Sequence, residues 1–271
     1  MLNGLIRKPP AAVRRQLRQE VGFRCPANCG NPYLTWHHFD PPWAIEHHHR
    51  ADGMVALCLD HASQADAGAF TDDQLRQMKR HGRDASMAIQ GRFEWMRRDL
   101  LAVVGGNFYY KTPVILEIGP RPCVWFGQDA TGYLLVNFWM PTLAGQPRAQ
   151  IFENGWIVPP SVADVECPPN GRRLKVWYPG GDRLNVEFFE IPDPGTLKDR
   201  YQDARIDWTN DITFPLTGVE IAERAAGTPI EFGARQSRMP GGIMRDCFMS
   251  NCGGGIHIGV PAGLQTPPEP T

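Results

Sequence analysis

The segment CPANC at residues 25–29 is followed by LTWHHFD at 34–40 and by CLDH at 58–61. Each outer segment carries two soft metal ligands across a tight turn, and about thirty residues separate the two pairs, a spacing typical of tetrahedral zinc sites. Such an ion would supply folding energy to a segment with little regular hydrophobic periodicity. The predicted ligands of this structural zinc ion are Cys25, Cys29, Cys58 and His61.

A second group of polar residues lies within and after this segment. His37 and His38 are adjacent, Pro41 follows at the spacing HH-x-x-P, and Asp66 comes eight residues after Cys58. The order of two cysteines, HH-x-x-P, a central histidine, L-C-x-x-H and a closing ligand resembles the HNH endonucleases of the ββα-metal, treble-clef-like fold. The resemblance covers roughly residues 17–78.

The resemblance implies a role for each matching residue. His38 matches the general base that activates water, and His37 matches the preceding position, which binds the catalytic metal ion. Asp66 matches the closing ligand of that ion, and His49 lies near the middle element as a supporting residue. Gly53 stands where the family has an asparagine, so a backbone carbonyl or another side chain must fix the tautomer of His38.

The implied activity is metal-dependent hydrolysis of phosphodiester bonds in DNA. A histidine can take a proton from water at neutral pH, and a divalent ion can stabilise the leaving oxygen. One imidazole and one carboxylate suit Mg²⁺, Mn²⁺ or a softer divalent ion. Adjacent residues of a regular strand point to opposite faces, so we expect the His37–His38 step at a strand end or a distortion. His47 and His48 are expected to be exposed.

Two rivals to this interpretation stay open. A zinc module that binds nucleic acid or protein without cutting would carry the same four ligands, and the missing asparagine favours it. An RNase of the same fold is a further alternative, although RNA is the less expected partner.

Helical patterns flank the histidine-rich segment. Residues 11–21 form a short amphipathic pattern that ends at Gly22, and its arginines Arg14, Arg15 and Arg18 are expected on a solvated or phosphate-contacting face. Thr71 to Gln74 read as the N-terminal cap of a second helix that continues to about His81.

The remainder of the chain changes to a period of two. Short apolar alternating runs separated by Gly and Pro turns predict a mostly antiparallel all-β domain, a sandwich or a barrel. The expected fold class is therefore α+β, with an HNH domain over residues 1–88, a β-rich domain of unknown role over 89–260 and a disordered Pro-rich tail over 261–271. The β-rich domain could mediate homo-oligomerisation.

Composition adds weaker expectations. Residues 1–99 hold 14 Lys and Arg against 11 Asp and Glu, whereas the rest hold 14 against 18, which places the more basic part with the expected DNA site. No apolar run approaches the roughly 18 residues of a membrane span, and the first ten residues lack the apolar segment of a secretory signal. A cytoplasmic location is expected. We interpret Cys123, Cys167, Cys247 and Cys252 as buried or partly buried thiols.

Overall fold

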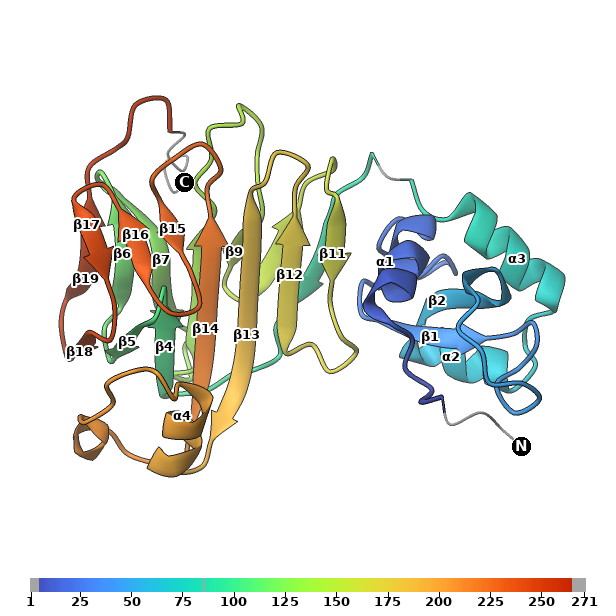
Figure 1. Cartoon of the computed structure of the whole chain (residues 1–271), viewed down its shortest axis with the longest axis horizontal. Helices are drawn as coiled ribbons and strands as arrows, with labels where there is room; N and C mark the ends of the chain where they lie inside the picture. The colour runs from blue at the N-terminus through green and yellow to red at the C-terminus, as the bar shows by residue number, and fades with distance from the viewer. Residues whose placement is uncertain (1–4, 85, 265–271) are drawn as a thin grey trace.

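The computed structural model describes residues 5–84 and 86–264. It has a small N-terminal module, drawn in blue and teal, beside a larger β-rich body (Figure 1). The two parts are mixed α+β and have separate hydrophobic cores, one formed by residues between 17 and 75 and the others by residues between 89 and 264. No helix among the described residues is long and apolar enough to cross a membrane.

The N-terminal module is built on an antiparallel hairpin of β1 and β2. Leu34 of β1 lies opposite Cys58 of β2, and His38 lies opposite Met54, so the fifteen residues between the strands form a long loop over one end of the hairpin. The elements of this module are α1 (Ala11–Glu20), β1 (Leu34–His38), η1 (Ala51–Gly53), β2 (Met54–Cys58), α2 (Leu59–Asp66) and α3 (Asp72–His81).

Local sequence signals account for the ends of these helices. Thr71 accepts a hydrogen bond from the backbone of Gln74, and the Gln74 side chain accepts one from the Thr71 backbone, so the capping box of α3 is formed. Gly82 follows α3 with a φ of 53°, a conformation that glycine adopts without steric cost. The predicted second helix is confirmed. α1 buries Leu17 against the hairpin.

The β-rich body contains two sheets. The seven-stranded sheet runs in the order β19 (Gly254–Ile258), β6 (Val114–Ile118), β7 (Arg121–Gln128), β8 (Leu134–Trp139), β9 (Gln150–Phe152), β10 (Gly155–Val158), β3 (Ile89–Arg92). The main path of the ten-stranded sheet is β11 (Asp164–Glu166), β12 (Arg173–Trp177), β13 (Arg183–Ile191), β14 (Leu216–Arg224), β15 (Glu231–Phe232), β16 (Ser237–Met239), β17 (Gly242–Met244). Its other strands are β4 (Leu100–Val104), β5 (Asn107–Tyr110) and β18 (Phe248–Ser250).

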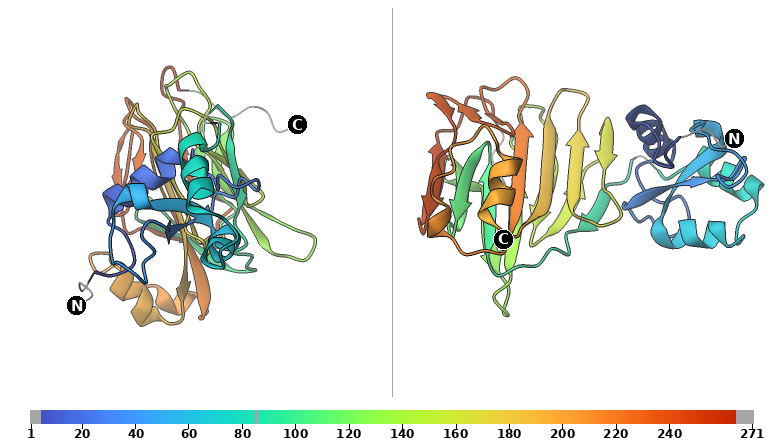
Figure 2. Two further views of the ribbon diagram at one scale, coloured as in Figure 1. Left: turned by 90° about the vertical axis from the view of Figure 1, so that its right-hand side faces the viewer. Right: turned by 60° about the horizontal axis from the view of Figure 1, so that its bottom comes forward.

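The two sheets pack face to face as a sandwich. One buried cluster contains residues of both sheets, so their inner faces share a core. Leu116 and Phe138 belong to the seven-stranded sheet, and Val186 and Val219 belong to the ten-stranded sheet. Most pairings are antiparallel, as predicted, but β4 pairs with β14, β5 with β18 and β6 with β19 in parallel. α4 (Pro194–Arg200) and η2 (Thr209–Asp211) lie in the chain between β13 and β14 and cover a second cluster (Figure 2).

Side chains of α1 join the module to the sandwich. Arg18 donates two hydrogen bonds to the carboxylate of Asp164 in β11, and Gln19 donates one to the carbonyl of Ala163. The expectation of a solvated or phosphate-contacting face was wrong for Arg18, which is buried in this junction. Its long side chain reaches a carboxylate on another element, which the periodicity of α1 could not indicate.

The C-terminal segment also contributes to the sandwich. Residues 261–264 of the predicted tail form a turn in which Leu264 is buried in the main cluster. Residues 265–271, over which the predicted tail continues, lie outside the described residues.

Candidate functional site

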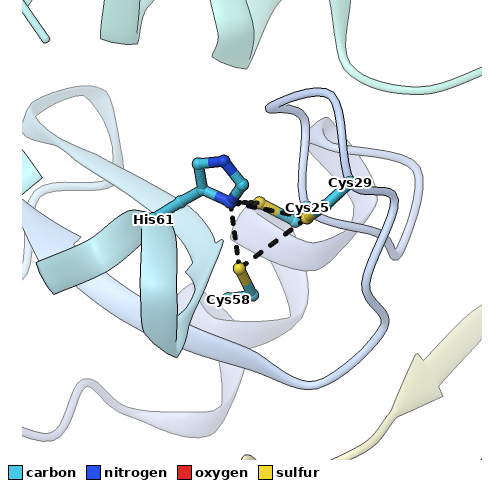
Figure 3. A group of neighbouring side chains, drawn as sticks. All are labelled: Cys25, Cys29, Cys58 and His61. Atoms are coloured by element: carbon cyan, nitrogen blue, oxygen red, sulfur yellow. Dashed lines mark hydrogen bonds between the residues drawn. The ribbon is translucent and has the colours of Figure 1, made fainter. Parts of the chain in front are cut away.

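Four side chains from three parts of the module converge on one point. Cys25 and Cys29 come from the loop after α1, Cys58 ends β2, and His61 lies in the first turn of α2. Figure 3 shows the imidazole of His61 turned toward the three sulfur atoms. The ligand atoms all lie within 4.8 Å of one another, close enough to hold one metal ion.

The spacing of these atoms fits a tetrahedral ion. Zinc–ligand bonds of about 2.3 Å to sulfur and about 2.0 Å to nitrogen imply edges of about 3.8 Å between sulfurs and about 3.5 Å from sulfur to nitrogen. The Sγ atoms of Cys29 and Cys58 are 3.8 Å apart, and Nδ1 of His61 lies 3.1, 3.4 and 3.7 Å from the three sulfurs. Burial raises the pKa of Cys25 to about 12, so its thiolate needs a cation beside it.

A second polar site lies between β1 and the C-terminal end of α2. Nδ1 of His37 is 3.1 Å from Oδ1 of Asp66; the histidine side chain is buried, whereas the carboxylate is 59% exposed. The two residues line an open cavity of about 560 Å³ together with Arg7 and Lys8. Burial lowers the pKa of His37, and Asp66 opposes this shift. A neutral imidazole beside an exposed carboxylate provides two ligands for a divalent ion, and the two basic side chains favour an anionic substrate.

His38 lies at the end of β1, as expected for the paired histidines, but it contacts different residues. It is 3% exposed, and its ring packs against Trp43 at a centroid distance of 4.7 Å and against His48 at 5.2 Å. His37 and His38 therefore follow the alternation of the strand, one toward Asp66 and the other toward the loop after β1. Burial, with His48 nearby, lowers the pKa of His38 to about 4.

The loop between β1 and β2 fixes the tautomer of His38. Nε2 of His38 is 3.1 Å from the carbonyl oxygen of His48. Because a carbonyl can only accept, Nε2 carries the proton and Nδ1 has the free lone pair. Nδ1 is buried and has no hydrogen-bond partner among the described residues. A backbone carbonyl thus takes the orienting position, one of the two alternatives that the sequence left open.

His48 was missed as a contributor to this site, and the expectation that it is exposed was wrong. It is 4% exposed, donates from Nε2 to the carbonyl of Pro41 at 2.9 Å and accepts from the backbone of Arg50 at 3.1 Å. His49, the predicted supporting residue, bonds through Nε2 to the carbonyl of Ile6, and its ring centroid is 6.4 Å from that of His38. The prolines Pro41 and Pro42, which precede the histidine run, are the sequence signal that could have indicated a loop folding back onto β1.

His47, also expected to be exposed, is half-buried. Its ring stacks on Trp43 at a centroid distance of 4.2 Å. Trp43 thus contacts the rings of both His47 and His38, so His47 packs indirectly against the general-base candidate. This arrangement depends on contacts within a loop, for which the sequence has no periodicity.

Gly53 occupies a position with no room for a side chain. A Cβ atom there would lie 2.0 Å from the carbonyl oxygen of Asp40 and 3.0 Å from the ring of His48. The carbonyl of Gly53 accepts hydrogen bonds from the backbone of Phe39 and Asp40, which draws the two ends of the long loop together. The absence of an asparagine at this position therefore has a steric reason.

The other four cysteines lie in the sandwich. Cys123 and Cys167 are buried, Cys247 and Cys252 are half-buried, and all four are free thiols. Their burial agrees with the expectation from the sequence.

Comparison with known proteins adds no assignment. The chain matches no protein-family model, no curated protein and no solved structure. The chemistry of the site therefore has to be inferred from its own residues.

Proposed function

We propose that the N-terminal module is a metal-dependent endonuclease of the HNH type that hydrolyses phosphodiester bonds in DNA. Three features support this: a β1–β2 hairpin followed directly by α2, a cluster with the donor set of a structural zinc site, and paired histidines at the end of β1. In this proposal the cluster holds Zn²⁺ for stability and takes no part in the reaction.

The observation that carries the proposal is the contact between His37 and Asp66. A buried imidazole and an exposed carboxylate meet 3.1 Å apart in an open cavity whose other walls include Arg7 and Lys8. A Mg²⁺, Mn²⁺ or similar ion held there would stabilise the charge on the phosphate and the leaving oxygen. The guanidinium of Arg7 and the ammonium of Lys8 would bind neighbouring phosphates and orient the strand.

His38 supplies the base in this proposal. With Nε2 donating to the carbonyl of His48, the free lone pair of Nδ1 is in the state that accepts a proton from water. Nδ1 is buried under the loop that carries Trp43 and His48, on the face of β1 opposite to His37 and Asp66. Catalysis by His38 therefore requires that substrate binding both opens this loop and turns His38 toward the ion.

The burial of Nδ1 also favours a second candidate function. A histidine that is 3% exposed, tied to a backbone carbonyl and packed between aromatic rings is a common structural arrangement. In that case the module is a zinc-dependent binding domain for nucleic acid or protein, and the cavity beside His37 binds phosphate without cutting it.

Cleavage of supercoiled plasmid distinguishes the two candidates. The full chain is incubated with Mg²⁺, Mn²⁺ or Ni²⁺, and nicked and linear products are measured for wild type, His38→Ala, His37→Ala and Asp66→Ala. We expect wild type to cut and each variant to lose about 100-fold or more in rate, because one removes the base and two remove ligands. His257→Ala, an exposed histidine of the sandwich, is the control and should cut as wild type does.

Folding and metal content are measured on every variant, so that loss of rate is separated from loss of structure. A wild-type protein that holds zinc but leaves all DNA forms intact with all three ions, and that still binds DNA, would establish the binding module instead. Competition between labelled DNA and RNA then identifies the preferred nucleic acid, which we expect to be DNA.

A further inference from the structure

The strand register aligns a row of outward side chains across the ten-stranded sheet. From β12 to β17 the residues paired directly opposite one another are Trp177, Arg183, Arg224, Glu231, Arg238 and Ile243. Residues directly opposite on paired strands point to the same face, and the strand neighbours Val176 and Leu184 belong to the buried cluster between the sheets. The row therefore lies on the outer face of the sandwich. Five steps between neighbouring strands give it a length of about 24 Å.

The row is basic and open to solvent. Arg224 and Arg238 are exposed, and in the described part of the chain neither lies in salt-bridge range of a carboxylate. Glu231 pairs with Arg183 at 2.6 Å. Arg183 and Arg224 are direct cross-strand neighbours, and such a pair of like charges is unfavourable unless an anion lies over it. Three arginines against one glutamate leave the row with an excess of two positive charges.

An aromatic ring and a lysine lie at the β12 end of the row. Trp177 is half-buried, and Lys175 comes two residues before it on the same face of β12. Glu166 lies opposite Lys175 but pairs with Arg173, so among the described residues no carboxylate is in salt-bridge range of Lys175. Aromatic rings flanked by cations bind single-stranded nucleic acids, because a base stacks on the ring while the cations bind the phosphates beside it.

The β12 end of the row faces the module. Asp164 of β11 is the next residue of the row, and its charge is neutralised by Arg18 of α1. Arg15, one turn earlier in α1, is exposed, and its Nε lies 4.0 Å from the same carboxylate. The segment just before α1 carries Lys8, which lines the cavity beside His37. Figure 1 shows the strands of the row side by side, with α1 at the β11 end, so exposed cations continue from the row over α1 to the cavity.

We propose that this row binds single-stranded DNA and guides it to the module. A base stacks on Trp177, and Lys175, Arg224 and Arg238 bind phosphates of the same strand. The major groove of a duplex is about 12 Å wide and admits a helix or a two-stranded ribbon, so a duplex meets a row across six strands through its backbone alone. The proposal rests on the proposed nuclease function of the module, and it makes the β-rich domain the part that holds the substrate.

Fluorescence anisotropy of labelled DNA tests the proposal on the full chain. The protein is kept free of chelator and of added Mg²⁺, Mn²⁺ and Ni²⁺, so that binding is measured without cleavage. The probes are a single strand of about twelve nucleotides and the duplex of the same sequence. We expect the single strand to bind about tenfold more tightly, because only unpaired bases can stack on Trp177. A duplex that binds as tightly as the single strand would overturn the proposal.

Two charge variants locate the phosphate contacts. The double variant Arg224→Gln with Arg238→Gln should weaken single-strand binding about tenfold and reduce the salt slope by about 1.4, since each phosphate contact on a single strand contributes about 0.7. The matched control is Arg98→Gln with Lys111→Gln, which removes two exposed cations in the segment before β4 and in the turn after β5. The control should bind as wild type does. Wild-type affinity and salt slope in the Arg224 and Arg238 variant, or an equal loss in the control, would contradict the assignment.

Substitutions of Trp177 test stacking separately from charge. Trp177→Leu should weaken single-strand binding about fivefold or more with no change in the salt slope, whereas Trp177→Phe should keep most of the affinity. Equal affinities of the Leu and Phe variants would show that no base stacks at this position. These are binding measurements, so their outcome is independent of plasmid cleavage. A protein that cuts plasmid while its row variants bind as wild type loses only this surface, and one that binds through the row without cutting loses only the nuclease function.

Discussion

Arg18 of α1 and Asp164 of β11 form a buried, two-point ion pair between the module and the sandwich. Nε of Arg18 donates to Oδ1 of Asp164 at 2.9 Å and Nη2 donates to Oδ2 at 2.5 Å, and both side chains are less than a tenth exposed. A fork of two parallel hydrogen bonds fixes direction as well as distance. Glu166 is a second carboxylate near the same guanidinium, with 3.8 Å between Oε2 of Glu166 and Nη1 of Arg18. The junction is therefore polar, whereas the cores of the module and of the sandwich are apolar.

Asp164→Ala should destabilise the protein strongly, because it leaves the buried guanidinium of Arg18 without its main partner. Loss of one member of a buried pair costs about 3–5 kcal/mol, and Glu166 should keep the value near the lower end. Urea unfolding of wild type and variant gives the difference. The double variant Arg18→Met with Asp164→Leu should lose much less, since no charge remains buried.

Glu231→Ala is the matched control for this experiment. It breaks the Arg183–Glu231 pair, in which the arginine side chain is 52% exposed, so the expected cost is below about 1 kcal/mol. A cost for Asp164→Ala as small as that of the control would mean that the junction contributes little to stability.

Removal of the metal should unfold the module before the sandwich. The module has a small core of its own, and Cys25, Cys29, Cys58 and His61 bring the loop after α1 together with β2 and α2. We expect a metal ion bound by these four residues to supply a large part of the folding energy of the module. We expect a chelator to produce a separate, early unfolding transition in a thermal scan. We expect Cys58→Ser to bind no ion, which mass spectrometry of the intact protein measures.

The control for metal loss is Cys252→Ser, a half-buried cysteine of the sandwich. It should keep one ion per chain and melt as wild type does. A Cys58→Ser protein that still holds one ion per chain would disprove the assignment of the four ligands.

Local spacing predicted the parts of the structure that local geometry determines. The pairs Cys25 with Cys29 and Cys58 with His61 each span one turn, so their convergence follows from the sequence once the hairpin forms. The capping box at Thr71 is equally local. By contrast, the place of His48 depends on a loop that folds back onto His38, and hydrophobic periodicity does not report loop conformation.

Long-range pairing was the other part that the sequence could not predict. The alternating runs indicated strands and antiparallel sheets, but the parallel pairs of β14 with β4 and β6 with β19 join segments more than a hundred residues apart. The junction through Arg18 and Asp164 spans 146 residues and has no local signal. These contacts form only when the whole sandwich brings together segments that are far apart in the sequence. Patterns of residue types over short spacings do not show which distant segments will pair.

Gly53→Asn should destabilise the module, although an asparagine is the residue that the proposed HNH-type function leads one to expect at this position. The new Cβ atom would lie 2.0 Å from the carbonyl oxygen of Asp40, which is backbone and cannot move without opening the loop. We expect a cost of about 2 kcal/mol or more in urea unfolding, in line with overpacking against backbone. Gly259→Asn, where a Cβ meets no atom within 4 Å, should be close to neutral. Equal stability of Gly53→Asn and wild type would show that the loop accommodates a side chain there.

Glu223 of β14 should make the sandwich less stable as the pH rises. Its carboxyl group is 2% exposed, neither oxygen has a hydrogen-bond partner among the described residues, and burial together with the nearby charges of Asp182 and Glu231 raises its pKa well above 4.5. The buried thiol of Cys123 is close enough for Glu223 to raise its pKa, and the nearby cation of Arg148 is paired with Asp182. Because the folded state holds this proton more tightly than the unfolded chain does, its contribution to stability is complete below about pH 4.5 and is lost as the pH rises through the folded pKa.

Glu223→Gln removes this titration and leaves the shape of the side chain nearly unchanged. In urea unfolding between pH 5 and 9, wild type should lose stability with rising pH more steeply than the variant, so the difference between them grows toward alkaline pH. Glu153→Gln, an exposed carboxyl in the turn between β9 and β10, should follow wild type at every pH. Parallel pH profiles for wild type and Glu223→Gln would mean that Glu223 is ionised throughout, with a counter-charge that lowers its pKa into the usual range.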